Sequence, residues 1–117
     1  MADYTLIGQN YTPLDLEAKV TGKAKYAEDF RAEGMLFCKL LLSPMPHARV
    51  RGINASAALA MPGVRAILTA DDLPDIGPVE RALTNEPLYQ GEPILAVAAV
   101  DEVTAADAIE KIELDLE

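Results

Sequence analysis

The apolar residues of this chain come in short runs, and proline, glycine or charged residues interrupt nearly every one of them. Runs of roughly four to eight apolar or β-branched residues between such breaks favour strands over helices. We therefore expect strands over residues 35–43, 48–53, 64–69, 94–99 and 112–117. The first should be a buried strand, and the run at 94–99 is so apolar that it should be buried on both faces. The last alternates leucine or isoleucine with acidic residues, which predicts a half-buried strand with an acidic outer face.

Helix signals fall between these runs. Asn54 is placed to cap a short helix at 55–60 by accepting a hydrogen bond from a backbone amide two or three residues on. Pro62 and Gly63 would end that helix, since neither residue sustains one. Residues 69–74 predict one capped helical turn that ends at a proline.

A longer helix is expected near the end of the chain. Asp101 should cap it, and it should reach about Lys111. Val103, Ala106 and Ile109 recur every three residues and are expected to form its apolar face. Short strands with two or three short helices and Pro-rich connections describe a compact α+β domain.

The pattern divides the chain into an arm and a domain. Residues 1–19 lack clear periodicity and predict an extended arm, whereas residues 20–117 carry the strand and helix signals. Residues 74–87 hold three of the eight prolines and are the segment expected to be mobile. The sequence stops at the end of its last expected strand, so we expect a domain boundary there, or a chain cut from a longer one.

The charge balance argues against a nucleic-acid partner. Ten basic and nineteen acidic residues give a net charge of −9, whereas binding to phosphates needs clustered Lys and Arg. The basic residues that do cluster are expected to form solvated faces and not an anion site; they are Lys19, Lys23, Lys25, Arg49 and Arg51.

The sequence gives little support for a metal site or a reactive thiol. One cysteine and one histidine cannot assemble a zinc site of the Cys/His type. Asp71, Asp72 and Asp75 lack the glycine and the distal glutamate of a calcium loop, so capping and solvation explain them better. Cys38 lies inside an apolar run and should be a small buried hydrophobe. The chain shows no secretory signal and no apolar run long enough to span a bilayer, so the cytoplasm is the expected location; export as part of a folded complex stays open.

Catalytic and phosphate-binding motifs are equally sparse. Neither Ser43 nor Ser56 lies in a Gly-x-Ser-x-Gly elbow. His47 is separated from Ser43 by two prolines and is expected to bond backbone at the entry of a strand. Residues 21–24 read Thr-Gly-Lys-Ala, a fragment of a phosphate loop without the hydroxyl after the lysine. We therefore assign no catalytic, cofactor-binding or metal-binding residue.

Five stretches in order resemble a known family. They include Leu-Ser-Pro-Met-Pro-His-Ala-Arg at 42–49 and Tyr-Gln-Gly-Glu-Pro at 89–93, and their full extents are residues 18–30, 42–54, 57–74, 89–94 and 105–117. Together they resemble the N-terminal α/β hammerhead domain of the molybdenum-binding large subunit in the xanthine dehydrogenase and aldehyde oxidase family. This sequence has Asn54 where that family usually has Asp, and its segment at 81–87 is shorter than in many relatives.

The resemblance implies a structural part of an oxidoreductase. A molybdenum–pterin cofactor in further domains, beyond residue 117 or on another chain, would oxidise or hydroxylate an aldehyde, an N-heterocycle or a similar compound. Iron–sulfur clusters and possibly FAD on partner domains or subunits would carry the electrons away. In that family the cofactor loops and the catalytic glutamate lie in later domains, so none is carried over to a residue of this chain. The alternative is a stand-alone, non-catalytic binding or adaptor module of the same fold.

Overall fold

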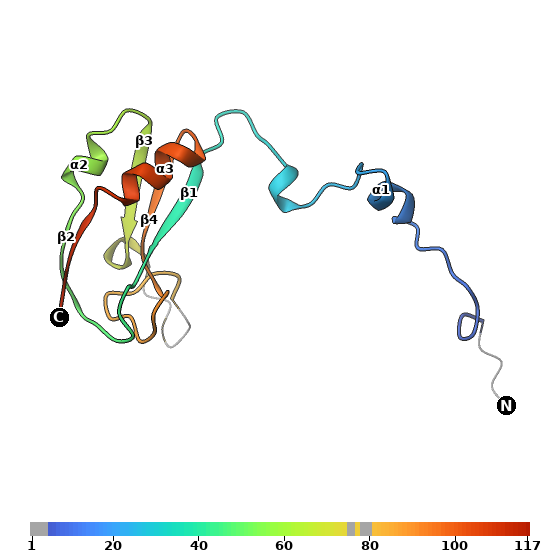
Figure 1. Cartoon of the computed structure of the whole chain (residues 1–117), viewed down its shortest axis with the longest axis horizontal. Coiled ribbons are helices and arrows are strands. Elements are labelled where there is room, and N and C mark those ends of the chain that lie inside the picture. The colour runs from blue at the N-terminus through green and yellow to red at the C-terminus, as the bar shows by residue number, and fades with distance from the viewer. Residues whose placement is uncertain (1–4, 75–76, 78–80) are drawn as a thin grey trace. The chain divides into compact units, whose positions relative to one another are not determined.

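The computed structural model describes residues 5–74, 77 and 81–117 of the chain (Figure 1). Its internal contacts separate two units, Met1–Glu33 (unit 1) and Gly34–Glu117 (unit 2), which are described in turn. Asp75 and four other residues of the loop expected to be mobile, residues 76 and 78–80, lie outside the described residues, so the mobility of that loop stays a prediction.

Unit 1 is built from two short helical segments, α1 (Leu16–Val20) and η1 (Ala27–Asp29). The segment expected to be extended therefore ends in a helical turn. An ion pair of 2.5 Å between the Lys19 Nζ and Asp15 Oδ2 atoms spans one turn of it, a spacing that stabilises helices. None of residues 5–33 is buried, and the apolar side chains of this unit are exposed.

Unit 2 contains two antiparallel sheets, which confirms the expected α+β class (Figure 1). The three-stranded sheet has the order β1-β4-β3, from strands β1 (Phe37–Leu42), β4 (Pro93–Ala99) and β3 (Val64–Thr69). The two-stranded sheet pairs β2 (Val50–Asn54) with β5 (Glu113–Leu116). The helical elements are α2 (Ser56–Leu59), η2 (Ala70–Asp72) and α3 (Glu102–Ile109).

Strand β4 is the centre of the core, as its uninterrupted apolar run predicts. Leu95 and Val97 are completely buried there and form a cluster with Ala58 of α2 and Ala108 of α3. Side chains from the two-stranded sheet pack against the same cluster, including Leu114 of β5. The alternating exposure along β5 confirms its predicted acidic outer face.

The predicted apolar face of α3 is wrong for two of its three residues, since only Ile109 packs against the core. Val103 is 70% exposed and Ala106 is also exposed, whereas Ala105 and Ala108 are completely buried against the sheet. The small methyl groups let the helix approach the strands more closely than a valine would, and close packing outweighs the three-residue spacing. Asp101 does cap this helix as expected, because its Oδ1 accepts a hydrogen bond of 2.7 Å from the Thr104 amide.

The predicted cap of α2 is displaced by one residue. Asn54 is the last residue of β2, and Ala55 occupies the cap position without a side-chain hydrogen bond. The Asn54 Oδ1 still accepts from the Ser56 amide at 3.3 Å, the local bond that made it look like a cap. At η2 the expected capped turn is present, since Asp72 Oδ2 accepts from the Thr69 amide at 2.7 Å.

Strand β1 is half-buried, whereas the sequence predicted a buried strand. Its exposure alternates along the whole strand: Leu41 contacts the core, and Leu40 and Leu42 lie on the opposite face. Because the run is apolar on both faces, it carries no alternation of polarity from which the exposed side could be recognised. Lys39 points to the core side at the sheet edge and pairs with Glu102 of α3 at 2.5 Å.

Candidate functional site

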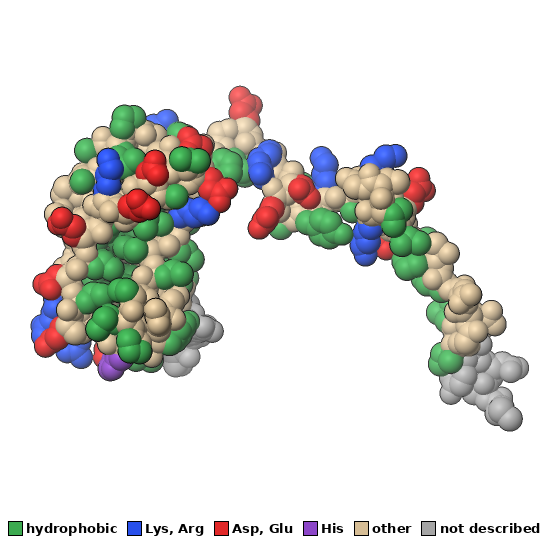
Figure 2. Space-filling model, in the orientation of Figure 1, with side chains coloured by type: hydrophobic (Ala, Val, Ile, Leu, Met, Phe, Trp, Pro, Cys, Tyr) green, Lys and Arg blue, Asp and Glu red, His purple; other side chains and the backbone are tan. Residues whose placement is uncertain are grey.

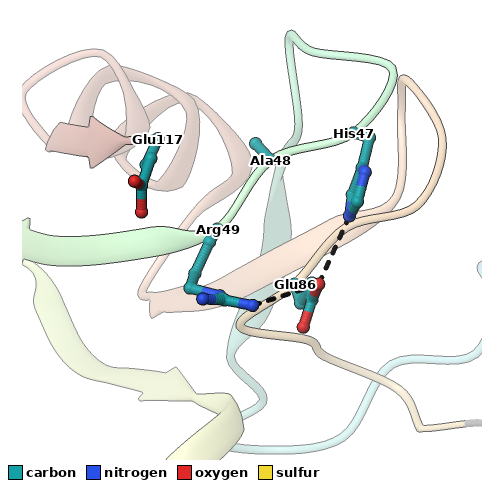
Figure 3. A pocket seen from close by; sticks show the side chains of 5 residues that line it. All are labelled: His47, Ala48, Arg49, Glu86 and Glu117. Carbon is teal, nitrogen blue, oxygen red and sulfur yellow. Dashed lines mark hydrogen bonds and ion pairs between the residues drawn. The ribbon is translucent and has the colours of Figure 1, made fainter.

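A polar depression of about 200 Å³ lies beside the start of β2 and is lined by His47, Ala48, Arg49, Glu86 and Glu117 (Figure 3). Backbone pairing brings these distant residues together. The Arg49 amide donates to the Glu117 carbonyl at 2.7 Å, and the Glu117 amide donates back to the Arg49 carbonyl at 2.9 Å. The Ala48 amide donates to the Pro87 carbonyl at 3.1 Å, which places Glu86 opposite both basic side chains.

Glu86 is the centre of the charges in this depression. Its Oε1 atom lies 3.3 Å from the His47 Nε2 and 3.6 Å from the Arg49 guanidinium, as the dashed lines in Figure 3 show. Glu117 instead pairs with Arg51. All five of the paired side chains are exposed. Solvated pairs of this kind contribute only about 0–1 kcal/mol each and lack the low dielectric that acid–base catalysis exploits.

Ser43 and His47 have different hydrogen-bond partners. Ser43 is buried, and its hydroxyl donates to the Met45 carbonyl at 3.0 Å and accepts from the Met45 amide at 3.2 Å. The hydroxyl therefore closes a turn and is not activated as a nucleophile. The prediction that His47 hydrogen-bonds to the backbone is wrong. The partner of its ring is the Glu86 carboxylate, which the backbone hydrogen bond between Ala48 and Pro87 brings close.

Cys38 is exposed, which corrects the prediction that it is buried. It occupies the same side of β1 as Leu40 and Leu42, away from the core. An exposed thiol is available to reagents, but reactivity as a nucleophile also needs a base or a cation beside it. No ion pair or side-chain hydrogen bond connects a charged group to Cys38 among the described residues.

The described aspartates after β3, Asp71 and Asp72, accept hydrogen bonds from nearby side chains and backbone. Asp71 accepts from the Asn85 amide nitrogen at 2.7 Å. Asp72 accepts from the Thr69 backbone amide and also from the Thr69 hydroxyl, at 2.9 Å, and these bonds, the backbone one foremost, lower its pKa from the usual value. Asp75 lies outside the described residues. Within those residues, no three His, Cys, Asp or Glu side chains gather in a way that could hold a metal ion.

The phosphate-loop fragment at 21–24 lies at the wrong end of a helix. Phosphates bind at helix N-termini, where free amides point outward, but here the segment follows the C-terminus of α1. All four amides donate to backbone carbonyls of that helix, and those of Lys23 and Ala24 both reach the Ala18 carbonyl at 2.8 Å. No amide is left for an anion, so this segment is a helix cap.

Three basic residues of the two expected clusters have acidic partners. Arg49 and Arg51 each face a glutamate, and Lys19 faces an aspartate. On the face of unit 2 shown in Figure 2, basic and acidic side chains are interspersed.

Comparison with known families decides the assignment. The family model described as the aldehyde oxidase and xanthine dehydrogenase a/b hammerhead domain matches residues 21–117. The chain belongs to this hammerhead family. It is therefore a domain of the molybdenum hydroxylase family, whose relatives are oxidoreductases.

Two curated relatives of this hammerhead domain are large enzyme subunits. The large chain of carbon monoxide dehydrogenase from Afipia carboxidovorans is 41% identical over 82% of this chain and 13% of its own length. The molybdenum-binding subunit of xanthine dehydrogenase from Escherichia coli O157:H7 is 34% identical over 89% of this chain and 16% of its own length. The chain thus spans less than a fifth of the length of either of these two relatives.

Solved structures carry the same hammerhead fold. CO dehydrogenase from Oligotropha carboxidovorans superposes with a TM-score of 0.86 at 35% identity, covering 94% of this chain and 15% of that one. Aldehyde oxidoreductase from Desulfovibrio gigas superposes with a TM-score of 0.83 at 29% identity, covering 94% and 14%. Among the described residues, no helix is long and apolar enough to cross a membrane.

Proposed function

We propose that this hammerhead domain is a structural, N-terminal part of a molybdenum hydroxylase and supplies no catalytic group of its own. The observation that carries the proposal is the match across unit 2 with a family of molybdenum oxidoreductases, in a domain whose polar side chains are exposed or used in local bonds. Its stable core and its sheets would then provide a surface on which the cofactor-binding part folds and packs.

The described residues do not fit a molybdenum–pterin group. Such a group needs a cradle of free backbone amides and buried polar side chains, but the amides at 21–24 are all occupied and the depression around Glu86 is open to solvent. No buried side-chain nitrogen or oxygen lacks a hydrogen-bond partner among the described residues. We therefore assign the cofactor to another part of the enzyme and route no chemical step through this chain.

The whole enzyme is proposed to carry out a two-electron oxidation of an aldehyde, an N-heterocycle or a similar small molecule. Molybdenum–pterin domains, fused or on a separate chain, would bind this domain directly. An iron–sulfur subunit or domain, and possibly a flavin subunit, would complete the electron path, and the cytoplasm is the proposed location. The relatives support this scheme because their names describe a molybdenum-binding subunit and large chains of dehydrogenases.

Co-expression tests the structural role. The chain would be produced alone and together with the molybdenum-binding part encoded in the same cell, and its melting temperature would be measured in both preparations. A partner that binds only the folded state must raise the melting temperature. An unchanged melting temperature, with no co-purification, would contradict the proposal and favour the stand-alone adaptor module.

A further inference from the structure

One face of the three-stranded sheet is apolar, and none of the described helices of unit 2 packs on it. The helices α2 and α3 pack on the other face, where Leu41, Val97 and Ile67 point into the core. The pairing register assigns the opposite side chains to one surface, here called the outer sheet face. It consists of Cys38, Leu40, Leu42, Ala66, Leu68, Ala96 and Ala98.

The residues of the outer sheet face lie in rows across the strands. Ala96 of the central strand is opposite Leu40 on one side and Leu68 on the other. Ala98 is opposite Cys38 and Ala66 in the same way. Directly opposed residues of an antiparallel pair project to the same side of the sheet. Small side chains therefore run along the middle of the face, and leucines flank them on both edge strands.

This composition is unusual for a sheet face that water covers. An antiparallel sheet with one solvated face normally alternates apolar and polar residues, so that polar side chains point outward. Here none of the seven assigned residues is charged, and Leu40, Leu42 and Leu68 remain 45%, 45% and 47% exposed. Contiguous exposed apolar surface on a soluble domain marks an interaction site.

We propose that the outer sheet face is the surface through which this domain packs on the molybdenum-binding part of its enzyme, and that the occupant is an uncharged, apolar segment of that part. The inference rests on the proposed function. The chain carries a net charge of −9, yet none of the seven residues assigned to this face is charged, so an apolar partner fits it better than a phosphate-rich or ionic one.

The size of the relatives supports the same occupant. The chain matches only 13% and 16% of two of them, so most of each polypeptide lies outside the matched region and is available to cover the face. The domain superposes on CO dehydrogenase over 94% of its length, so it shares the fold of a segment that makes up only 15% of that chain. The rest of the same enzyme is therefore the simplest partner for the outer sheet face.

Cys38 is a built-in probe of this face, because it is the only cysteine of the chain and is exposed on it. The species that carries this domain would be captured from its native cell and treated with iodoacetamide, natively and after unfolding. Mass spectrometry of the Cys38 peptide would give both alkylation rates, and molybdenum content and mass would be measured on the same sample. We expect a molybdenum-containing species in which native alkylation is slower by on the order of tenfold or more.

A matched pair of substitutions tests the face in the assembled enzyme. Leu40→Asp places a charge on the outer sheet face, and Val103→Asp places the same charge at an exposed position of α3 on the other side of the sheet. Leu40→Asp should lower the yield of molybdenum-containing enzyme by on the order of tenfold, since a buried unpaired charge opposes association. Val103→Asp should leave the yield unchanged, and an equal loss from both variants would overturn the assignment.

The outcomes separate this inference from the proposed function. A molybdenum-containing species whose Cys38 reacts as fast as the unfolded chain would overturn the outer sheet face and leave the proposed function standing. Protection of Cys38 in a molybdenum-free species of 12.6 kDa, or of a multiple of that mass, would instead show that this chain or a second copy covers the face, and would overturn the inference. A molybdenum-free species with a reactive Cys38 would overturn both.

Discussion

Replacing Gly63 with alanine should destabilise unit 2 strongly, because this glycine combines an unusual backbone angle with a close contact. Its φ angle is +95°, a region that residues with a side chain rarely adopt. Its carbonyl accepts a hydrogen bond of 2.9 Å from the Val100 amide, which holds the turn before β3 against the end of β4. A Cβ atom there would lie 2.9 Å from the Val100 Cγ2 and 3.2 Å from the Thr104 Cγ2.

The magnitude follows from these two effects. A side chain at positive φ costs about 1–2 kcal/mol, and forcing a methyl group into a packed contact costs a further 1–3 kcal/mol or so. Alanine restores about 0.4–1 kcal/mol by restricting the unfolded chain. The expected loss is therefore about 2–4 kcal/mol, which for a domain of this size lowers the melting temperature by roughly 10–30 °C.

Gly91 provides the matched control for Gly63. Its φ angle is also +95°, but nothing lies within 4 Å of a Cβ atom built on it. Gly91→Ala should therefore show the backbone cost alone, about 1 kcal/mol. Thermal unfolding followed by circular dichroism would compare both variants with the parent chain. Val100→Ala should also recover part of the loss when combined with Gly63→Ala, because it removes the nearest methyl group. Equal melting temperatures for Gly63→Ala and Gly91→Ala would refute the contact argument.

Further substitutions test the core, the acid dependence and the polar depression. Leu95→Ala should cost about 2–5 kcal/mol in denaturant unfolding, because the side chain is completely buried; Leu88→Ala, at a position 67% exposed, should stay within about 0.5 kcal/mol of the parent. The hydrogen bond from the Thr104 amide is the main cause that lowers the pKa of Asp101. The ionised Asp101 side chain therefore stabilises the folded state above the unfolded pKa of about 3.9, and this stabilisation is lost as the pH falls through the lower folded pKa. Asp101→Asn should therefore flatten the fall in melting temperature below about pH 4, and an unchanged acid profile would contradict that role. Glu86→Gln should change the unfolding free energy by less than about 1 kcal/mol, because its two partners are exposed; a larger loss, measured in the same denaturant series, would show that the depression is structurally important.

Local signals explain why much of the fold was predictable. Asp101 caps α3 through a bond that spans three residues, and β5 follows an alternation that is complete within its own sequence. The central strand β4 was recognisable because its run is apolar throughout, but the prediction that both of its faces are buried is wrong, since Ala96 and Ala98 are only half-buried. In each case the residues that define the element are neighbours in the chain.

The errors arose where the outcome depends on packing between distant elements. Helix α3 is apolar on more than one face, and only the close approach of the sheet selects Ala105 and Ala108 over Val103. The apolar run of β1 gave no sign that Cys38 and Leu40 are on the open side. Periodicity alone cannot distinguish two apolar faces.

The polar depression was beyond sequence reasoning for a related reason. Glu86 lies 39 residues from His47, and the two meet because backbone bonds join the segments around Ala48 and Pro87. No short motif marks such a meeting.

The most direct test of the central claim is the molybdenum content of the native species that carries this domain. An antibody against unit 2 would capture it under non-denaturing conditions, and its mass and metal content would be measured together. The structural role in a molybdenum hydroxylase predicts a species far larger than 12.6 kDa, with molybdenum present in near-stoichiometric amount to this domain. A free 12.6 kDa chain without molybdenum would contradict the account and leave a stand-alone binding module.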